Sequence, residues 1–164
     1  MSHLRIGVVA DTHGLLREEV LRAMEGCSRI LHLGDVGADD ILDRLAALAP
    51  LTAIRGNVDR NGRCAQLPEC EVVTEAGRML YLLHDRKQLD LAPEAAGIAA
   101  VLSGHTHQPL IAWNRGVLYL NPGACGPRRF RLPISCAWLD LFDDGSLQPT
   151  LVDLAASGSG CRVG

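Results

Sequence analysis

The sequence has no long hydrophobic run and no strong excess of one charge. No apolar stretch approaches the roughly 20 residues that a membrane-spanning helix needs. The stretch nearest the N-terminus is too short for a signal peptide and meets Asp11 at once. We therefore expect no contact with a membrane and a cytoplasmic location. The 16 Lys+Arg against 19 Asp+Glu give a formal net charge of −3, which argues against a nucleic-acid binder that depends on bulk positive charge.

No pair of the six cysteines has the Cys-x-x-Cys spacing of a zinc knuckle or a redox motif. Without an export signal we expect the reducing cytosol, where disulfides are rare. The sequence therefore predicts free thiols, most of which pack as small hydrophobic side chains. They are Cys27, Cys64, Cys70, Cys125, Cys136 and Cys161.

Neither an internal repeat nor a linker divides the chain. Its 164 residues are 48% hydrophobic and 21% charged, which is typical of one globular domain with one core. The only low-complexity stretch is the run of alanine, serine and glycine at 155–160. We predict a single domain over residues 1–154 and a flexible tail over residues 155–164.

Strand and helix patterns alternate over the first third of the chain. Continuous apolar runs rich in β-branched residues are typical of strands buried on both faces, and they alternate here with leucines at helical spacing. Strands are predicted at 4–10, 29–33 and 51–55, and helices at 16–26 and 39–48. This alternation predicts right-handed crossovers and a parallel inner sheet.

Hairpin patterns dominate the rest of the chain. Paired strands flank polar or glycine-containing turns at 71–83, 110–120 and 135–153. A short helix at 93–96 precedes a buried strand at 98–102. We therefore expect an α/β fold whose first half continues into a more antiparallel second sheet, with the two sheets packed face to face in one domain.

Histidine and acidic residues follow the predicted strands. Five clusters stand at or beside strand ends, where the ligands of open α/β folds gather. Imidazole, carboxylate and amide groups form a mixed nitrogen and oxygen set that suits Mn, Fe, Co, Ni or Zn rather than Ca. The five clusters together therefore predict a transition-metal site. They contain Asp11, His13, His32, Asp35, Asn57, Asp59, His84, His105 and His107.

Local spacing supports the same interpretation. Residues i and i+2 of an extended segment point the same way, so Asp11 could bind one ion with His13, and His105 with His107. Each cluster alone is also compatible with a capped turn, and the prediction depends on the whole set. Glycine precedes three of the polar residues and lets the backbone turn sharply there, at positions 34, 56 and 104.

The order of these motifs resembles the calcineurin-like metallophosphoesterases, and in particular their small, single-domain phosphodiesterase branch. Asp-x-His, Gly-Asp, Gly-Asn-x-Asp, His, Gly-His-x-His and Asn-Pro-Gly occur in that order within residues 4–131. The resemblance implies a two-sheet β-sandwich flanked by helices, the metallo-dependent phosphatase fold. It also implies a phosphodiesterase that hydrolyses a phosphate ester by attack of a hydroxide bridging two metal ions.

The resemblance also implies the ligands of two divalent transition-metal ions. Asp35, Asn57 and His105 would act in catalysis through these ions. Mn²⁺ is the expected metal, with Fe, Co, Ni or Zn as alternatives. His32 either steadies the cluster by a hydrogen bond or is a satisfied histidine at a strand end. In this assignment Asp11, His13 and His107 hold the first ion, Asp35 bridges both ions, and Asn57, His84 and His105 complete the second site.

Departures from the family pattern bear on the substrate. Val58 stands where many members carry a histidine that assists the leaving group, and the phosphodiesterase branch lacks that histidine too. Asp59 is the nearest replacement, unless it orients a metal ligand. Asp85 follows His84 where the family has glycine, and it could enter the metal shell, repel anions or point away. The turn after Asn-Pro-Gly lacks the usual serine, and Arg128 beyond it either contacts substrate phosphate or belongs to a solvated basic loop.

Two alternatives stand beside the phosphodiesterase. A phosphomonoesterase acting on a nucleotide or phosphoprotein would use the same ligands, but Val58 disfavours it. A non-catalytic scaffold like the retromer subunit of this fold needs no ligands, whereas all seven expected positions hold residues able to ligate. As partner we expect a small-molecule phosphate ester, and neither a membrane nor a nucleic acid. Exposed hairpin edges leave a homo-oligomer open.

Overall fold

The computed structural model describes residues 3–154 and 162–163, so most of the predicted tail lies outside the described residues. β1 (His3–Val9) lies inside a six-stranded sheet, because its apolar run is buried on both faces. It pairs in parallel with β2 (Arg29–His32) and antiparallel with β9 (Ser135–Phe142). The order is β11-β10-β9-β1-β2-β3, where the outer strands are β3 (Leu51–Ala53), β10 (Leu147–Asp153) and β11 (Arg162–Val163).

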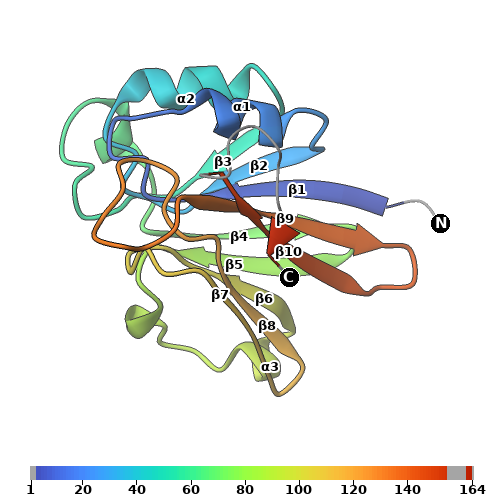
Figure 1. Ribbon diagram of the computed structural model, residues 1–164. Coiled ribbons are helices and arrows are strands. Elements are labelled where there is room, and N and C mark those ends of the chain that lie inside the picture. The colour runs from blue at the N-terminus through green and yellow to red at the C-terminus, as the bar shows by residue number, and fades with distance from the viewer. Residues whose placement is uncertain (1–2, 155–161, 164) are drawn as a thin grey trace.

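A five-stranded sheet with the order β4-β5-β6-β8-β7 forms a second layer (Figure 1). Its outer pairs are antiparallel hairpins, and β6 pairs in parallel with both of its neighbours. The strands are β4 (Cys70–Glu75), β5 (Arg78–Leu83), β6 (Ile98–Leu102), β7 (Leu110–Asn114) and β8 (Val117–Asn121), and α3 (Pro93–Ala96) precedes β6.

Two helices cover the face of the larger sheet that points away from the smaller one, α1 (Glu18–Met24) and α2 (Asp39–Ala46) (Figure 1). β1 supplies both cores by alternation, since Val9 packs under the helices and Val8 packs between the sheets. A Cβ at Gly7 would lie 2.2 Å from Met24 Sδ. Glycine at this position therefore lets α1 approach the sheet closely.

The predicted α/β fold with two packed sheets is confirmed, but two details of the prediction were wrong. The second sheet, expected to be more antiparallel, is mixed, with two antiparallel and two parallel strand pairs. The last hairpin, β9 with β10, joins the first sheet through β1. β9 has buried side chains on both faces, with Cys136 toward the helices and Leu139 toward the other sheet. A strand with this pattern must be covered on both faces, and the position beside β1 provides that cover.

The helices are shorter than predicted. α1 covers 18–24 rather than 16–26, and α2 covers 39–46 rather than 39–48. Leu16 is buried although it precedes α1. It belongs to the core but not to the helix, and its apolar side chain therefore made the predicted helix too long at its start. Two short 3-10 turns were not predicted, η1 (Arg63–Gln66) and η2 (Arg86–Gln88). No helix in the described part of the chain has the length and apolarity needed to cross a membrane.

Four of the five described cysteines are buried and all five are free; Cys161 lies outside the described residues. Burial raises the pKa of Cys27 to about 11 and that of Cys125 to about 12. Only Cys70 among the five is exposed. The interpretation of the thiols as small hydrophobic side chains therefore agrees with four of these positions.

We expect one fast-reacting thiol in a Cys161→Ser variant. Only the thiolate is nucleophilic, and raised pKa values together with burial suppress it at the four buried cysteines. A thiol reagent at pH 8 should therefore label Cys70 within minutes, and mass spectrometry of peptides should locate the label there. Labelling in urea should release the other four cysteines. Fast labelling of two or more thiols in the native protein would contradict this burial pattern.

Candidate metal centre

Backbone hydrogen bonds join the loops that follow β1 and β2, and these loops present the first candidate ligands. The N–H of Asp11 donates to the carbonyl of Gly34 at 3.0 Å, and the N–H of His13 donates to that of Asp35 at 2.9 Å. The loops after β5 and β6 bring His84, His105 and His107 from the other sheet. The expected position at the carboxyl ends of strands is therefore confirmed, and both sheets contribute to it.

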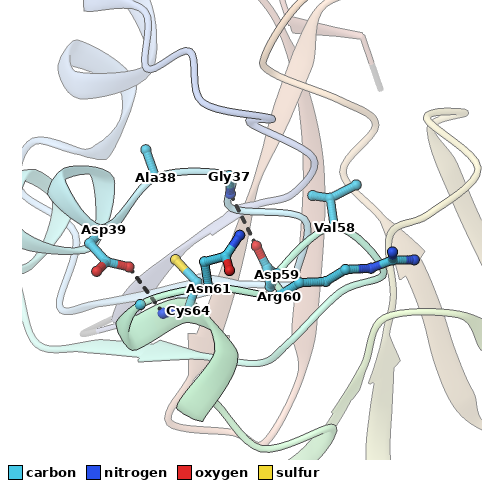
Figure 2. Close-up of a pocket in the computed structure, with 9 residues that line it drawn as sticks. Gly37, Ala38, Asp39, Val58, Asp59, Arg60, Asn61 and Cys64 are labelled. Carbon is cyan, nitrogen blue, oxygen red and sulfur yellow. Dashed lines mark hydrogen bonds between the residues drawn. The ribbon is translucent and has the colours of Figure 1, made fainter.

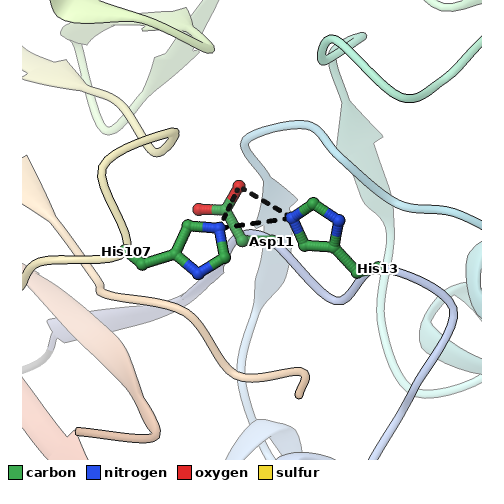
Figure 3. Close-up of side chains that lie close together, drawn as sticks. All are labelled: Asp11, His13 and His107. Carbon is green, nitrogen blue, oxygen red and sulfur yellow. Dashed lines mark hydrogen bonds and ion pairs between the residues drawn. The ribbon is translucent and has the colours of Figure 1, made fainter. Parts of the chain in front are cut away.

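Asp11, His13 and His107 form one group of side chains that could hold a metal ion (Figure 3). The Nε2 atoms of the two histidines lie 3.2 Å apart. Asp11 Oδ1 lies 3.8 Å from His13 Nε2 and 3.7 Å from His107 Nε2. These distances leave the three side chains pointing at one position.

Asp11, Asp35 and His84 form a second group of the same kind. His84 Nε2 lies 3.2 Å from Asp35 Oδ2 and 3.9 Å from Asp11 Oδ1. His84 Nδ1 lies 2.7 Å from the carbonyl oxygen of Leu33. A carbonyl only accepts, so Nδ1 holds a proton, and Nε2 is the atom that faces the two carboxylates.

Asp35 lies between the two groups. Its Oδ2 is 3.4 Å from His13 Nε2 in the first group and 3.2 Å from His84 Nε2 in the second. Its Oδ1 accepts a hydrogen bond from the N–H of Val58 at 3.0 Å. Both carboxylates therefore lie at the centre of the cluster. Asp11 belongs to both groups, and Asp35 lies between His13 of the first group and His84 of the second.

Burial and charge give these groups unusual protonation behaviour. Burial raises the pKa of Asp11 to about 7. Burial acts in the same direction on Asp35, but His84 and the N–H of Val58 outweigh it and lower the pKa of Asp35 to about 2. Burial, helped by the charge of Arg129, lowers the pKa of His107 to about 4. Neutral imidazole beside carboxylate is the state that binds cations.

The extended backbone expected at the Asp-x-His and His-x-His pairs was wrong. Asp11, His13, Asp35, His105 and His107 all have left-handed backbone, with φ between 45° and 72°. Residues other than glycine adopt this region at a cost of about 1 kcal/mol or more each. The side chains converge because the turns are tight, and the strain is concentrated at the candidate ligands.

The expected glycines lie where the backbone comes close to a ligand. A Cβ at Gly56 would lie 2.2 Å from Asp35 Oδ1, and one at Gly34 would lie 2.6 Å from His84 Nδ1. Gly34 also has φ of +99°. Any side chain at either position would displace a candidate ligand.

His105 and Asn57 lie at the rim of the cluster. The backbone N–H of His105 donates to Asp11 Oδ2 at 3.1 Å, and its ring packs edge-on against that of His84 with centroids 5.2 Å apart. Its Nε2 lies 3.8 Å from Asp85 Oδ2. Asn57 lies on the exposed turn directly after Gly56. The structure thus gathers five of the seven expected ligands tightly and leaves these two at the edge.

His32 ties the loops together and does not belong to either ligand group. It is fully buried, and the N–H of Gly34 donates to its Nδ1 at 3.1 Å. Its Nε2 then holds the proton and donates to Thr12 Oγ1 at 3.0 Å, while that hydroxyl donates to the carbonyl of Val36 at 2.7 Å. Burial lowers the pKa of His32 to about 3. Sequence reasoning missed Thr12, whose only signal is its position between two ligands.

Asp59 is buried beneath the loops after β2 and β3. Its carboxylate accepts backbone hydrogen bonds from Val36, Gly37 and Gly56 at 3.2, 3.1 and 2.8 Å. Figure 2 shows its link to Gly37 beside a cavity of about 270 Å³. This geometry favours an orienting role, because both oxygens are used in holding the loops of Asp35 and Asn57.

Two residues near the Asn-Pro-Gly turn also bear on the centre. Asn121 Nδ2 donates to the carbonyl of Gly104 at 3.0 Å and to Thr106 Oγ1 at 3.1 Å, so it holds the loop of His105 and His107. Arg128 is exposed. The next residue, Arg129, places its positive charge near enough to act on Asp11, His13 and His107. Arg129 was not among the sequence candidates.

We expect Asp59→Asn to destabilise the protein by about 1–3 kcal/mol, because an amide cannot accept from all three N–H groups and leaves buried donors unpaired. Urea unfolding of the protein without added metal measures this loss directly. Asp90→Asn, a matched change on an exposed loop, should stay within about 0.5 kcal/mol of the parent. Equal stability of the two variants would show that Asp59 does not hold these loops.

The chain matches the model of the calcineurin-like phosphoesterase superfamily domain over residues 4–144. It is 34% identical over 128 residues to a probable metallophosphoesterase of Methanocaldococcus jannaschii, covering 73% of this chain and 67% of that protein. It is also 34% identical over 131 residues to a probable metallophosphoesterase of Methanothermobacter thermautotrophicus, covering 73% of this chain and 76% of that protein.

Solved structures share the fold at lower sequence identity. The phosphoesterase Yfce from E. coli has a TM-score of 0.69 at 22% identity, over 98% of both chains. Vps29 from Entamoeba histolytica complexed with Zn²⁺ has a TM-score of 0.78 at 22% identity, again over 98% of both chains. The layered sheets are therefore those of the metallo-dependent phosphatase fold, and the chain belongs to the calcineurin-like phosphoesterase superfamily.

Proposed function

We propose that the chain is a metal-dependent phosphodiesterase with a dinuclear centre. The observation that supports this most directly is the pair of ligand groups that share Asp11, with Asp35 Oδ2 between His13 and His84. Two adjacent divalent cations repel each other and need a shared anion. Both carboxylates are positioned to serve as that anion.

The residues present fit divalent transition-metal ions. Asp11 Oδ1 and His84 Nε2 are buried, belong to the cluster and have no hydrogen-bond partner among the described residues. Carboxylate and imidazole ligands suit Mn, Fe, Co, Ni or Zn. When bound, such ions supply Lewis acidity toward phosphate oxygens and toward water. One ion would be held by Asp11, His13 and His107, and the other by Asp35, Asn57, His84 and His105.

The side chains around the cluster would bind and orient the phosphate ester. His105 has a side chain 40% exposed, against 20% for His13 and 3% for His107, so its ring is the more accessible to an entering ester. The positive charge of Arg129 acts on the cluster and would attract the phosphate. The lowered pKa of His107, about 4, keeps that ring neutral at pH 7 and leaves its lone pair for a cation.

Val58 supports a diester rather than a monoester as substrate. Val58 is 45% exposed on the turn after β3, and its side chain has no proton to give to a departing alcohol. The neighbouring Asp59 is occupied by three backbone hydrogen bonds. Without a proton donor at this position, we expect the chain to favour diesters whose alcohols leave readily, and phosphomonoesterase activity is the weaker alternative.

A non-catalytic scaffold on this fold is the other alternative. Such a protein gains nothing from left-handed backbone at five ligand positions, and nothing from a buried carboxylate oxygen that has no hydrogen-bond partner among the described residues. Here the buried Oδ1 of Asp11, which has no hydrogen-bond partner among the described residues, and the left-handed backbone of the ligand loops are costs that a cation site would explain. The ligand geometry therefore favours the enzyme over the scaffold.

Hydrolysis of bis(p-nitrophenyl) phosphate and of p-nitrophenyl phosphate tests the proposal. We expect no turnover after treatment with a chelator, recovery with Mn²⁺, and a preference for the diester. His107→Ala should lower kcat/KM for the diester more than about 100-fold, because changes at residues that merely support metal ligands already cost 10–100-fold.

His3→Ala is the matched control, since His3 lies at the start of β1 beside Asp140 and outside the cluster. It should keep the parent rate. Absence of turnover with Mn²⁺, Fe²⁺, Co²⁺, Ni²⁺ and Zn²⁺ in folded protein would contradict an enzymatic function. Equal rates for the diester and the monoester would contradict the phosphodiesterase assignment alone.

A further inference from the structure

A second cavity lies beside the candidate metal centre and is not part of it. Its volume is about 460 Å³, and it lies between the turn after β5 and the loop after β6. His105 forms one wall, so the cavity and the ligand cluster meet at this side chain. Its polar and charged lining includes Arg86, Lys87, Ser103, Gln108 and Asn121.

Two hydroxyl groups, those of Ser103 and Thr106, line this cavity. Ser103 is only 5% exposed and lines the cavity. Thr106 Oγ1 accepts from Asn121 Nδ2 at 3.1 Å and from the N–H of Gln108 at 3.2 Å. With its acceptor positions used, the Thr106 hydroxyl can donate to a ligand.

The rim of the cavity is positively charged. Arg86 and Lys87, the only lysine of the chain, lie on η2 and are exposed. The guanidinium of Arg86 lies 5.9 Å from the centroid of the Tyr119 ring, which restrains it. Two cations at the mouth of a polar cavity favour an anionic ligand.

Asp85 is the one acidic residue of the lining, and each of its oxygens faces a group of the protein that can balance it. Its Oδ1 accepts from the backbone N–H of Lys87 at 3.0 Å, which fixes the start of η2. Its Oδ2 lies 3.8 Å from His105 Nε2. The carboxylate thus holds the basic turn and faces the imidazole at the boundary with the metal centre.

We propose that this cavity binds the alcohol half of the phosphodiester, and that this half bears an anionic group together with free hydroxyls, as a sugar phosphate does. The proposal rests on the proposed function, because it places the ester phosphate at the metal centre and the alcohol past His105. Arg86 and Lys87 would bind the anionic group. Ser103 and Thr106 would donate to its hydroxyls.

Calorimetric titration of the full chain with ribose 5-phosphate and with ribose tests this assignment, before and after removal of metal by chelation and dialysis. We expect ribose 5-phosphate to bind in both states and ribose to bind at least tenfold more weakly. Arg86→Ala and Lys87→Ala should each weaken binding of ribose 5-phosphate about tenfold, since each removes a charge-assisted hydrogen bond. Ser103→Ala should weaken it several-fold.

Arg60→Ala is the matched control, because Arg60 lines the other cavity near Val58. It should bind ribose 5-phosphate as the parent does. Binding that disappears with the metal, or that survives Arg86→Ala and Lys87→Ala together, would overturn the proposal. Binding without any diester hydrolysis would support the cavity and contradict the proposed function, whereas hydrolysis without binding would contradict the cavity alone.

Discussion

The carboxylate of Asp11 joins the two sheets to the candidate metal centre, and the arrangement of the site depends on it. Its Oδ2 accepts the N–H of His105 from the loop of the smaller sheet. Its Oδ1 lies within 4 Å of the Nε2 atoms of His13, His84 and His107 and has no hydrogen-bond partner among the described residues. A buried carboxylate in this state costs free energy unless positive charge balances it. A bound cation would therefore stabilise the fold and serve the chemistry at once.

Polar side chains with hydrogen-bond partners surround the buried Asp11 carboxylate and hold the loops whose backbone is left-handed. His32 and Thr12 form a neutral chain of hydrogen bonds between the loops after β1 and β2. Asp59 binds three backbone N–H groups beneath Asp35, and Asn121 holds the loop of His107. Left-handed backbone persists at non-glycine residues only where the surroundings fix it. These supports are therefore as necessary to the site as the ligands themselves.

The sequence predicts the strands and the location of the site well, for a physical reason. Apolar runs such as 4–10 identify buried strands, and the carboxyl ends of parallel strands must meet at one edge. It could not predict that β9 pairs with β1, since a hairpin pattern does not say which sheet edge it joins. Nor could it predict the left-handed turn at Asp11 or the role of Thr12, because both depend on contacts with the loop after β2.

Two of the three departures from the family pattern, Val58 and Asp85, lie on different loops beside the centre. At Val58, on the loop after β3, an exposed apolar side chain has no proton to donate, which would restrict the alcohols that can leave under the proposed function. At Asp85, on the loop after β5, the carboxylate fixes η2 and so places two cations at the mouth of a polar cavity. Under the proposed function, the first change would weaken the reaction for poor leaving groups, and the second would add binding for one kind of alcohol. If the proposed function holds, the two loops would make the enzyme select its substrate by the alcohol half of the ester, since the phosphate half would meet the metal centre.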